Sequence, residues 1–133
     1  MDASPPTSRS TFRFPVRVYW EDTDAGGVVF YANYLKFFER ARTEWLRSLG
    51  VGQQALREAT GAIFIVAETQ LRYIAPARLD DALLVLTKLA KVRAASVDIH
   101  QRVMRQHAIL TEADVEAAFV TPEGRPRRQP RYG

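Results

Sequence analysis

The patterned part of the chain begins with apolar residues at alternate positions, which is typical of a half-buried strand. Within residues 11–20 the alternating apolar positions are Phe12, Phe14, Val16 and Val18. Pro15 lies inside this run. Because proline has no N–H to donate to a strand ladder, we expect this strand to lie at a sheet edge or to start late.

A helical period follows from Asn33 to Leu49. Its apolar residues recur every three or four positions, at Tyr34, Phe38, Ala41, Trp45 and Leu49. This spacing places them on one stripe of a helix. Asn33 is the expected N-cap and Gly50 the expected C-terminal stop. The charged residues of the same stretch, among them Glu39, Arg42 and Glu44, are predicted to lie on the opposite face.

Strand-like patterns fill most of the remaining chain. A short helical piece is expected over Gln53–Ala59, and the predicted strands that follow it are 63–74, 83–92, 96–104 and 109–121. The links at 91–95 and 105–108 have hairpin length, which favours antiparallel neighbours. The pattern predicts an α+β domain over residues 12–121, in which an antiparallel sheet of about five strands wraps one long helix.

Composition narrows the class of protein. The chain has 133 residues, the size of one ordinary domain, and 47% of them are hydrophobic. It has no cysteine, which excludes disulfides, thiolate nucleophiles and cysteine-based metal sites. We see no apolar run of the length of a signal peptide core or a membrane span, so we expect a cytoplasmic protein without a transmembrane segment.

The net charge of +4 is concentrated at the C-terminus. Residues 122–133 carry four arginines and one glutamate, which leaves residues 12–121 nearly neutral. This distribution argues against a nucleic-acid partner. The basic segment 122–133 is predicted to be a disordered tail, and residues 1–11 a flexible N-terminal segment.

The candidate chemistry lies between the first strand and the long helix, in Glu-Asp-Thr-Asp-Ala-Gly-Gly-Val-Val at positions 21–29. Glycines let a backbone approach a ligand closely, and a helix N-terminus offers free N–H groups that suit an oxyanion. A carboxylate such as Asp24 aimed at the same point could attack a thioester or activate water. A solvated turn is the alternative reading of this segment.

Other acidic residues compete with Asp24. On an extended segment Asp22 would point to the opposite side, so we do not expect both carboxylates at one substrate atom. A metal site built from Glu21, Asp22 and Asp24 is disfavoured, because no histidine lies nearby and a hard cation needs more oxygen ligands.

Two longer motifs resemble a known family. They are Tyr-Trp-Glu-Asp-Thr-Asp-Ala-Gly-Gly-Val-Val-Phe-Tyr-Ala-Asn-Tyr-Leu at 19–35, continued by Glu-Arg-Ala-Arg-Thr-Glu at 39–44, and Tyr-Ile-Ala-Pro-Ala-Arg-Leu-Asp-Asp at 73–81. Together with the strand pattern, they resemble the hot-dog-fold acyl-CoA thioesterases of the 4-hydroxybenzoyl-CoA thioesterase family. Within that family the chain is most similar to small bacterial members encoded with the Tol–Pal envelope system.

The resemblance implies roles for individual residues. Asp24 matches the catalytic carboxylate, and the backbone N–H of Tyr31 matches the group that polarises the thioester carbonyl. Lys88, Lys91 and Arg93 are the set implied for the coenzyme A phosphates, with a solvated sheet edge as the equal alternative. A sister branch uses a helix carboxylate, which makes Glu39 and Glu44 lesser candidates.

The resemblance also implies an assembly and a reaction. It implies a homodimer or homotetramer with active sites at subunit interfaces, and hydrolysis to coenzyme A and an acid without metal or redox cofactor. Acyl carrier protein is a further candidate partner. Many Tol–Pal-associated members have histidine at the position of Tyr31, and the histidines of this chain, His100 and His107, are predicted to be surface residues.

Two alternatives to hydrolysis remain. The chain could bind acyl thioesters without hydrolysing them, or it could be a hot-dog dehydratase or hydratase. The latter normally needs an Asp–His pair, and neither histidine stands in a matching motif.

Overall fold

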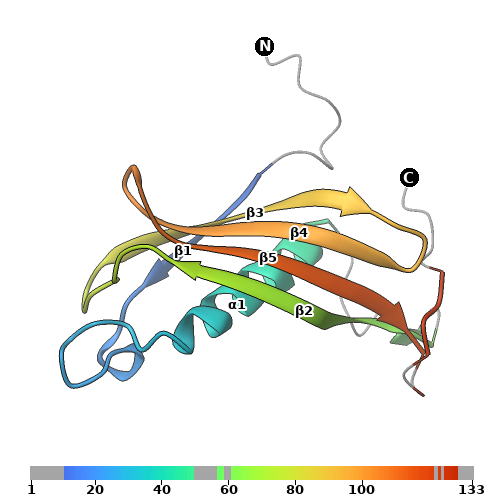
Figure 1. Ribbon diagram of the computed structural model, residues 1–133, viewed down its shortest axis with the longest axis horizontal. Helices are drawn as coiled ribbons and strands as arrows, with labels where there is room; N and C mark the ends of the chain where they lie inside the picture. The colour runs from blue at the N-terminus through green and yellow to red at the C-terminus, as the bar shows by residue number, and fades with distance from the viewer. Residues whose placement is uncertain (1–10, 50–56, 59–60, 122, 124, 129–133) are drawn as a thin grey trace, which may run out of the picture.

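The computed structural model describes residues 11–49, 57–58, 61–121, 123 and 125–128. In chain order, its elements are β1 (Phe12–Arg17), the 3-10 turn η2 (Trp20–Asp22), α1 (Asn33–Ser48), β2 (Ile63–Tyr73), β3 (Ala82–Val92), β4 (Ser96–Arg105) and β5 (Ala108–Val120). The strands form one sheet in the order β1-β3-β4-β5-β2, and all neighbours are antiparallel. Figure 1 shows α1 lying against one face of this sheet. The predicted α+β architecture is confirmed.

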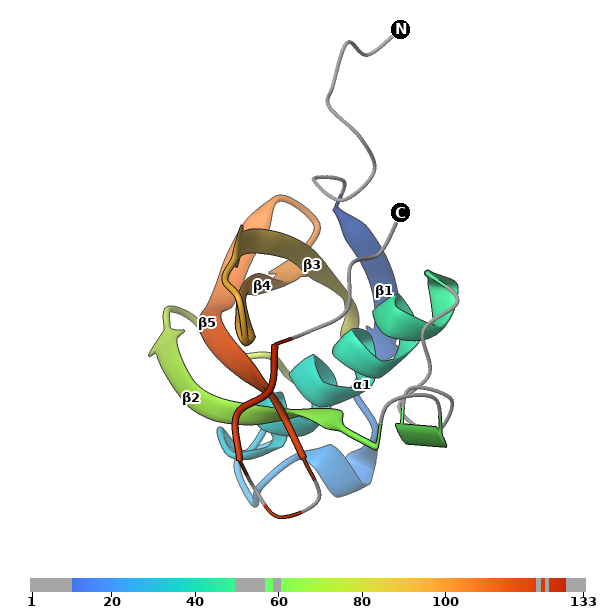
Figure 2. The ribbon, with the colours of Figure 1, turned by 90° about the vertical axis from the view of Figure 1, so that its right-hand side faces the viewer.

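The sheet curves around the helix. Figure 2 shows β1 on one side of α1 and β2 on the other, with β3, β4 and β5 between them. β1 is an edge strand, as Pro15 predicted, and its burial alternates residue by residue. β5 likewise turns Ala113, Val115 and Phe119 into the core. Because side chains alternate across a strand, this pattern puts one apolar face of the sheet against α1.

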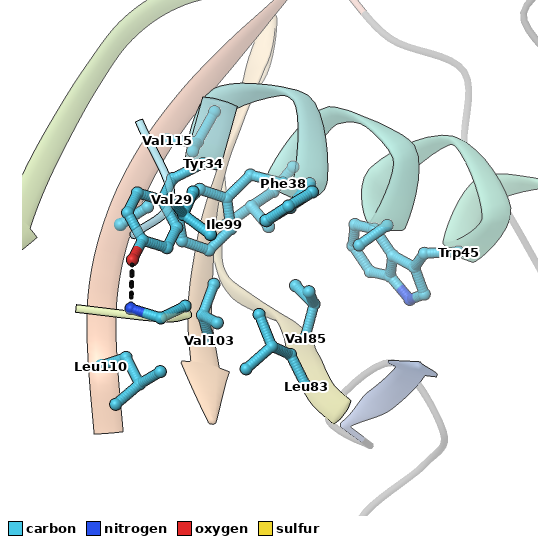
Figure 3. Packing of buried hydrophobic residues seen from close by; sticks show 14 of the residues in the cluster. Val29, Tyr34, Phe38, Trp45, Leu83, Val85, Ile99, Val103, Leu110 and Val115 are labelled. Carbon is cyan, nitrogen blue, oxygen red and sulfur yellow. Dashed lines mark hydrogen bonds between the residues drawn. The ribbon is translucent and has the colours of Figure 1, made fainter. Parts of the chain in front are cut away.

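The core lies between α1 and the inner face of the sheet. Tyr34, Phe38, Ala41 and Trp45 of the predicted stripe are buried, and Phe37 joins them with no exposed surface. Figure 3 shows Phe38 and Trp45 among residues that include Leu83, Val85, Ile99, Val103 and Val115 of the sheet. Burying each large apolar side chain contributes about 1.5–3 kcal/mol. This packing holds the start of α1 in place against the strands.

The predicted N-cap and the predicted burial of Leu49 need correction. Asn33 is not the N-cap, which is Ala32, but the first helical residue. Its side-chain amide instead donates a hydrogen bond to the Asp22 carbonyl at 3.0 Å. Leu49 follows the last helical residue, and 51% of it is exposed, so it leaves the stripe. The predicted stop at Gly50 lies outside the described residues.

The predicted short helix at 53–59 is described only in part. Arg57 and Glu58 are helical, and the other positions lie outside the described residues. Past β5, where the sequence predicts a disordered tail, described residues fold back onto the strand. Thr121 N–H donates to the Arg125 carbonyl, Arg127 N–H donates to the Phe119 carbonyl, and Pro126 forms a bridge with Val120.

Arg42 does not lie on the solvent face where the helical pattern placed it. Its guanidinium donates a 2.9 Å hydrogen bond to the side-chain oxygen of Gln101, which is fully buried on β4. The amide nitrogen of Gln101 donates to the Phe38 carbonyl and to the Thr87 hydroxyl. Burial lowers the pKa of the Arg42 guanidinium, against the opposing effect of Glu39. This polar network ties the middle of α1 to β3 and β4.

Candidate active site

Asp24 lies in a tight hairpin between η2 and α1. Thr23 and Val29 form a β-bridge, Asp24 N–H donates to the Val28 carbonyl at 2.9 Å, and Gly27 N–H donates to the Asp24 carbonyl at 3.0 Å. Gly27 has a φ of 77°, in the left-handed region that favours glycine. The double glycine therefore allows the chain to reverse directly after Asp24.

The Asp24 side chain is exposed and oriented by its own turn. Its Oδ1 accepts a 2.8 Å hydrogen bond from Gly26 N–H and a weaker contact of 3.4 Å from Val28 N–H. Its Oδ2 has no hydrogen-bond partner in the described part of the chain. One carboxylate oxygen is thus held by the backbone, and the other remains available.

Asp22 has a structural position instead. It is buried, and its Oδ2 accepts the Tyr19 N–H at 2.9 Å. Its carbonyl accepts Phe30 N–H at 3.1 Å and the Asn33 side chain at 3.0 Å. The two carboxylates are separated as predicted, but the cause is the 3-10 turn at Asp22 rather than an extended segment. Asp22 links the Asp24 hairpin to the start of α1.

The start of α1 presents free backbone donors. Asn33 N–H and Tyr34 N–H are used in the first turn, by the carbonyls of Phe30 and Tyr31. The N–H groups of Tyr31 and Ala32 donate to no residue that the structure describes. The N-terminus of a helix carries a partial positive charge, equivalent to about half an elementary charge. The Tyr31 amide therefore has the chemistry required to stabilise an oxyanion.

A short segment after β2 connects the hairpin to the helix; we call residues 74–79 the strap. Val29 N–H donates to the Ala77 carbonyl at 2.8 Å, and Leu79 N–H donates to the Gly27 carbonyl at 3.1 Å. Ala77 N–H donates to the Tyr34 hydroxyl at 3.0 Å, the dashed line in Figure 3. The strap thus contacts both the Asp24 hairpin and the first turn of α1.

An ion pair anchors the far end of the strap. The Asp81 carboxylate accepts Arg78 N–H and the Arg105 guanidinium, each at 2.8 Å. Arg105 also donates to the Pro76 carbonyl at 3.2 Å. Burial raises the pKa of the Asp81 carboxyl, but the bonds from Arg78 and Arg105 outweigh it and leave that pKa below its ordinary value. Asp81 and Arg105 are site-supporting residues that our sequence reasoning missed, although Asp81 lies in the second motif.

Aromatic rings from two parts of the chain meet at Tyr31. The Tyr31 ring stacks on Phe30 at 5.4 Å and meets Tyr73 edge-on at 5.7 Å, and Tyr73 lies 5.7 Å from Tyr34. Phe30, Tyr31 and Tyr73 are 49%, 63% and 47% exposed. An apolar surface therefore borders the candidate site, and the contribution of Tyr73 to it was not predicted.

The predicted coenzyme A residues do not join Asp24 within one chain. Lys88 and Lys91 are exposed in the second half of β3, and Arg93 is exposed just after this strand. Ala82, at the start of β3, pairs with Arg17, which comes shortly before the Asp24 hairpin in the chain. Lys88 lies roughly 20 Å along the strand from that point, at ~3.3 Å per residue. Arg93 forms an ion pair with Asp98.

The remaining candidates make no hydrogen bond or ion pair with the hairpin among the described residues. Glu39 is exposed, and Glu44 pairs with Arg47. His107 is exposed as predicted, whereas the His100 side chain is only 21% exposed and lies 2.9 Å from an Asp114 oxygen. Antiparallel pairing of β4 with β5 brings His100 and Asp114 together.

Among the described residues, no group of three or more histidine, aspartate or glutamate side chains could hold a metal ion.

Comparisons with known proteins agree with this architecture. The Thioesterase-like superfamily model matches residues 18–130. The chain is 50% identical over 109 residues to the acyl-CoA thioesterase YbgC of Haemophilus influenzae, covering 82% of this chain and 80% of that protein. No helix in the described ranges is long and apolar enough to cross a membrane.

Solved structures show the same fold. A probable thioesterase from Bartonella henselae superposes with a TM-score of 0.85 at 35% identity, covering 91% of this chain and all of that one. A 4-hydroxybenzoyl-CoA thioesterase variant in complex with 4-hydroxybenzoyl-CoA superposes with a TM-score of 0.84, over 90% of this chain and 93% of that one. At 19% identity the second match speaks for the fold alone. The chain has the hot-dog fold and belongs to the thioesterase-like superfamily.

Proposed function

We propose that this protein hydrolyses acyl-CoA thioesters to coenzyme A and a free carboxylic acid. The observation that carries the proposal is that a carboxylate and a backbone N–H, both open to a substrate, lie on segments that the strap holds together. Within the described residues, one Asp24 carboxylate oxygen and the Tyr31 N–H at the positive end of α1 have no hydrogen-bond partner. The strap contacts the elements that carry both. The 50% identity to an acyl-CoA thioesterase supports the same reaction.

The proposed step needs few groups. The thioester oxygen accepts the Tyr31 N–H, which stabilises the negative charge that develops when the carbonyl carbon is attacked. Asp24 either takes a proton from the attacking water or attacks the carbon itself. The carbon–sulfur bond then breaks, and the thiolate of coenzyme A leaves and is protonated. In the second route, water subsequently hydrolyses the acyl-Asp24 anhydride.

The edge strand β2 supports a homodimer. β2 has 11 residues and ends the sheet, and its hydrophobic residues Ile65 and Val66 are 44% and 46% exposed. A long exposed edge strand with apolar side chains is a template for pairing with another chain. We propose that β2 pairs with β2 of a second copy, and that two such dimers can form a tetramer. Native mass spectrometry tests this assembly, and a monomer at micromolar concentration would exclude it.

A thiol-release assay over short, long and aromatic acyl-CoAs tests the proposed reaction, with acyl thioesters of acyl carrier protein measured in parallel. Hydrolysis of at least one acyl-CoA is expected. Binding of acyl-CoA without any thiol release would favour a non-hydrolytic binding protein instead. Turnover confined to the carrier-protein thioesters would change the substrate class but leave the chemistry in place.

Lys88 and Lys91 are proposed to contact the coenzyme A phosphates across the subunit interface, together with Arg93. The double substitution Lys88→Ala/Lys91→Ala should raise KM for acyl-CoA about 10-fold with little change in kcat, because charge-assisted bonds to phosphate are lost on binding. The matched control is the same acyl group on N-acetylcysteamine, which has no phosphates and should show an unchanged KM. An equal rise in KM for both substrates would contradict phosphate contact.

Gly27 offers a test of the hairpin. Gly27→Ala should lower stability by about 1–2 kcal/mol, because its φ of 77° strains any L side chain. It should also lower kcat, because the strain acts on the turn that holds Asp24. Gly61 is a matched control with a φ of 74° and similar open space. Gly61→Ala should give a comparable drop in melting temperature with kcat unchanged, and equal losses of kcat in both variants would refute the local effect.

A further inference from the structure

Tyr73 lies beside the start of α1 although 42 residues separate it from Tyr31 in the chain. It is the last residue of β2. Its ring meets the Tyr31 ring edge-on and the Tyr34 ring at a tilt, each with centroids 5.7 Å apart. Its hydroxyl donates to the Tyr31 carbonyl at 3.4 Å. At that length the hydrogen bond is weak, so ring packing is the stronger of the two contacts.

These contacts restrain the backbone of Tyr31. Its carbonyl also accepts Tyr34 N–H at 3.2 Å, so the peptide that follows Tyr31 is held from two directions. Each residue has only two soft backbone dihedral angles. Holding both the carbonyl and the ring of Tyr31 therefore restricts the direction of its own N–H, which is the proposed oxyanion donor.

The segment that follows Tyr73 contacts the hairpin that carries Asp24. Ile74 and Ala75 N–H groups both donate to the Leu110 carbonyl, which anchors the beginning of the strap to β5. The strap then accepts Val29 N–H and donates to the Gly27 carbonyl of the Asp24 hairpin. One continuous stretch, from Tyr73 through the strap, thus contacts both Tyr31 and the hairpin that carries Asp24.

We propose that Tyr73 is a positioning residue for thioester hydrolysis, which orients the Tyr31 N–H relative to the Asp24 carboxylate without touching the reacting atoms. This inference rests on the proposed roles of Asp24 and Tyr31. Burial, together with the neighbouring Tyr31 and Tyr34, raises the pKa of the Tyr73 phenol. The hydroxyl therefore stays protonated, and able to donate, at neutral pH.

Two substitutions separate the ring from the hydroxyl. Tyr73→Leu should lower kcat about 10- to 100-fold and leave KM within about 3-fold, because small misplacements of catalytic groups cost rate rather than binding. Tyr73→Phe keeps the ring and should retain kcat within about 3-fold. A residue important only for stability would instead lower the melting temperature and leave kcat of the folded enzyme unchanged.

A double-mutant cycle tests whether Tyr73 acts through Tyr31. In a Tyr31→Ala background the ring contact is already absent, so adding Tyr73→Leu should lower kcat by less than about 3-fold further. Effects that multiply would overturn the proposal. Since Tyr73 is 47% exposed, the variant should fold. Should Tyr73→Leu fail to fold, Tyr73→Met removes the same ring and completes the cycle.

Asp24→Asn is measured beside these variants. If it is fully active, the proposed chemistry fails whatever Tyr73 does. If it is inactive while Tyr73→Leu keeps kcat within about 2-fold of the wild type, the chemistry stands and the positioning role of Tyr73 is refuted.

Discussion

Asp24→Asn is expected to lower kcat for acyl-CoA hydrolysis by about 10²–10⁴-fold, the range that general acid–base catalysis typically supplies. The amide cannot take a proton from water and is a poor nucleophile. Its Oδ1 can still accept the Gly26 N–H, so the hairpin should remain folded. Steady-state thiol release, together with an unchanged circular dichroism spectrum and melting temperature, measures the effect.

Glu21→Gln is the matched control for this substitution. Glu21 is an exposed carboxylate three positions earlier in the same acidic segment, and it belongs to η2 rather than to the Asp24 hairpin. Removing its charge should leave kcat within about 2-fold. Similar large losses in both variants would point to the net charge of the loop, and full activity of Asp24→Asn would remove Asp24 as the agent.

Labelled water distinguishes the two routes open to Asp24. In a single turnover in ¹⁸O-water, a nucleophilic Asp24 can acquire the label when the acyl-enzyme is hydrolysed. A general base transfers only a proton and keeps its original oxygens. Label found by mass spectrometry in the peptide that contains Asp24 therefore identifies the nucleophilic route.

Phe37→Ala is expected to lower the free energy of unfolding by about 3–5 kcal/mol, the usual cost of removing a buried aromatic side chain. Phe37 has no exposed surface and meets Tyr34 edge-on at 6.1 Å. The cavity would lie beneath the first turns of α1. Urea unfolding at a fixed protein concentration measures the change, since assembly would make stability depend on concentration.

Leu49→Ala provides the contrast. The sequence pattern assigns Leu49 to the buried stripe and omits Phe37, whereas the structure leaves Leu49 51% exposed. Its removal should change the free energy of unfolding by less than about 1 kcal/mol. If Leu49→Ala were as destabilising as Phe37→Ala, the packing of α1 described above would be wrong.

Much of the fold could be predicted from local pattern. The alternation at Phe12, Phe14 and Val16 reappears as a half-buried strand face, and the helical spacing from Tyr34 to Trp45 reappears as a buried helix face. These signals depend only on the geometry of a single strand or helix, so neighbouring residues carry them. Pro15 even indicated the edge position of β1, because the missing donor is a local property.

The candidate site could be predicted only in part. Asp24 and Tyr31 came from a motif and its family resemblance, and their catalytic roles remain proposals. The structure adds what surrounds them: the buried position of Asp22, and the strap with its Arg105–Asp81 anchor. For Lys88 and Lys91 the resemblance implies a site shared with Asp24. Within one chain, however, they lie far along β3 from Ala82, the residue that pairs with Arg17 shortly before the Asp24 hairpin.

Local pattern and motif resemblance predicted the strands and the helix, the family, and the acidic segment 21–29 that is proposed to carry the chemistry. The strand order β1-β3-β4-β5-β2, the hydrogen bond of Arg42 to buried Gln101 and the contact of Tyr73 with Tyr31 became visible only in the folded chain. The reason is physical. Periodicity and turn chemistry act between residues a few positions apart. Strand order and side-chain pairing join distant residues, such as Phe12 and Thr87 across β1 and β3, and follow from how the whole core packs.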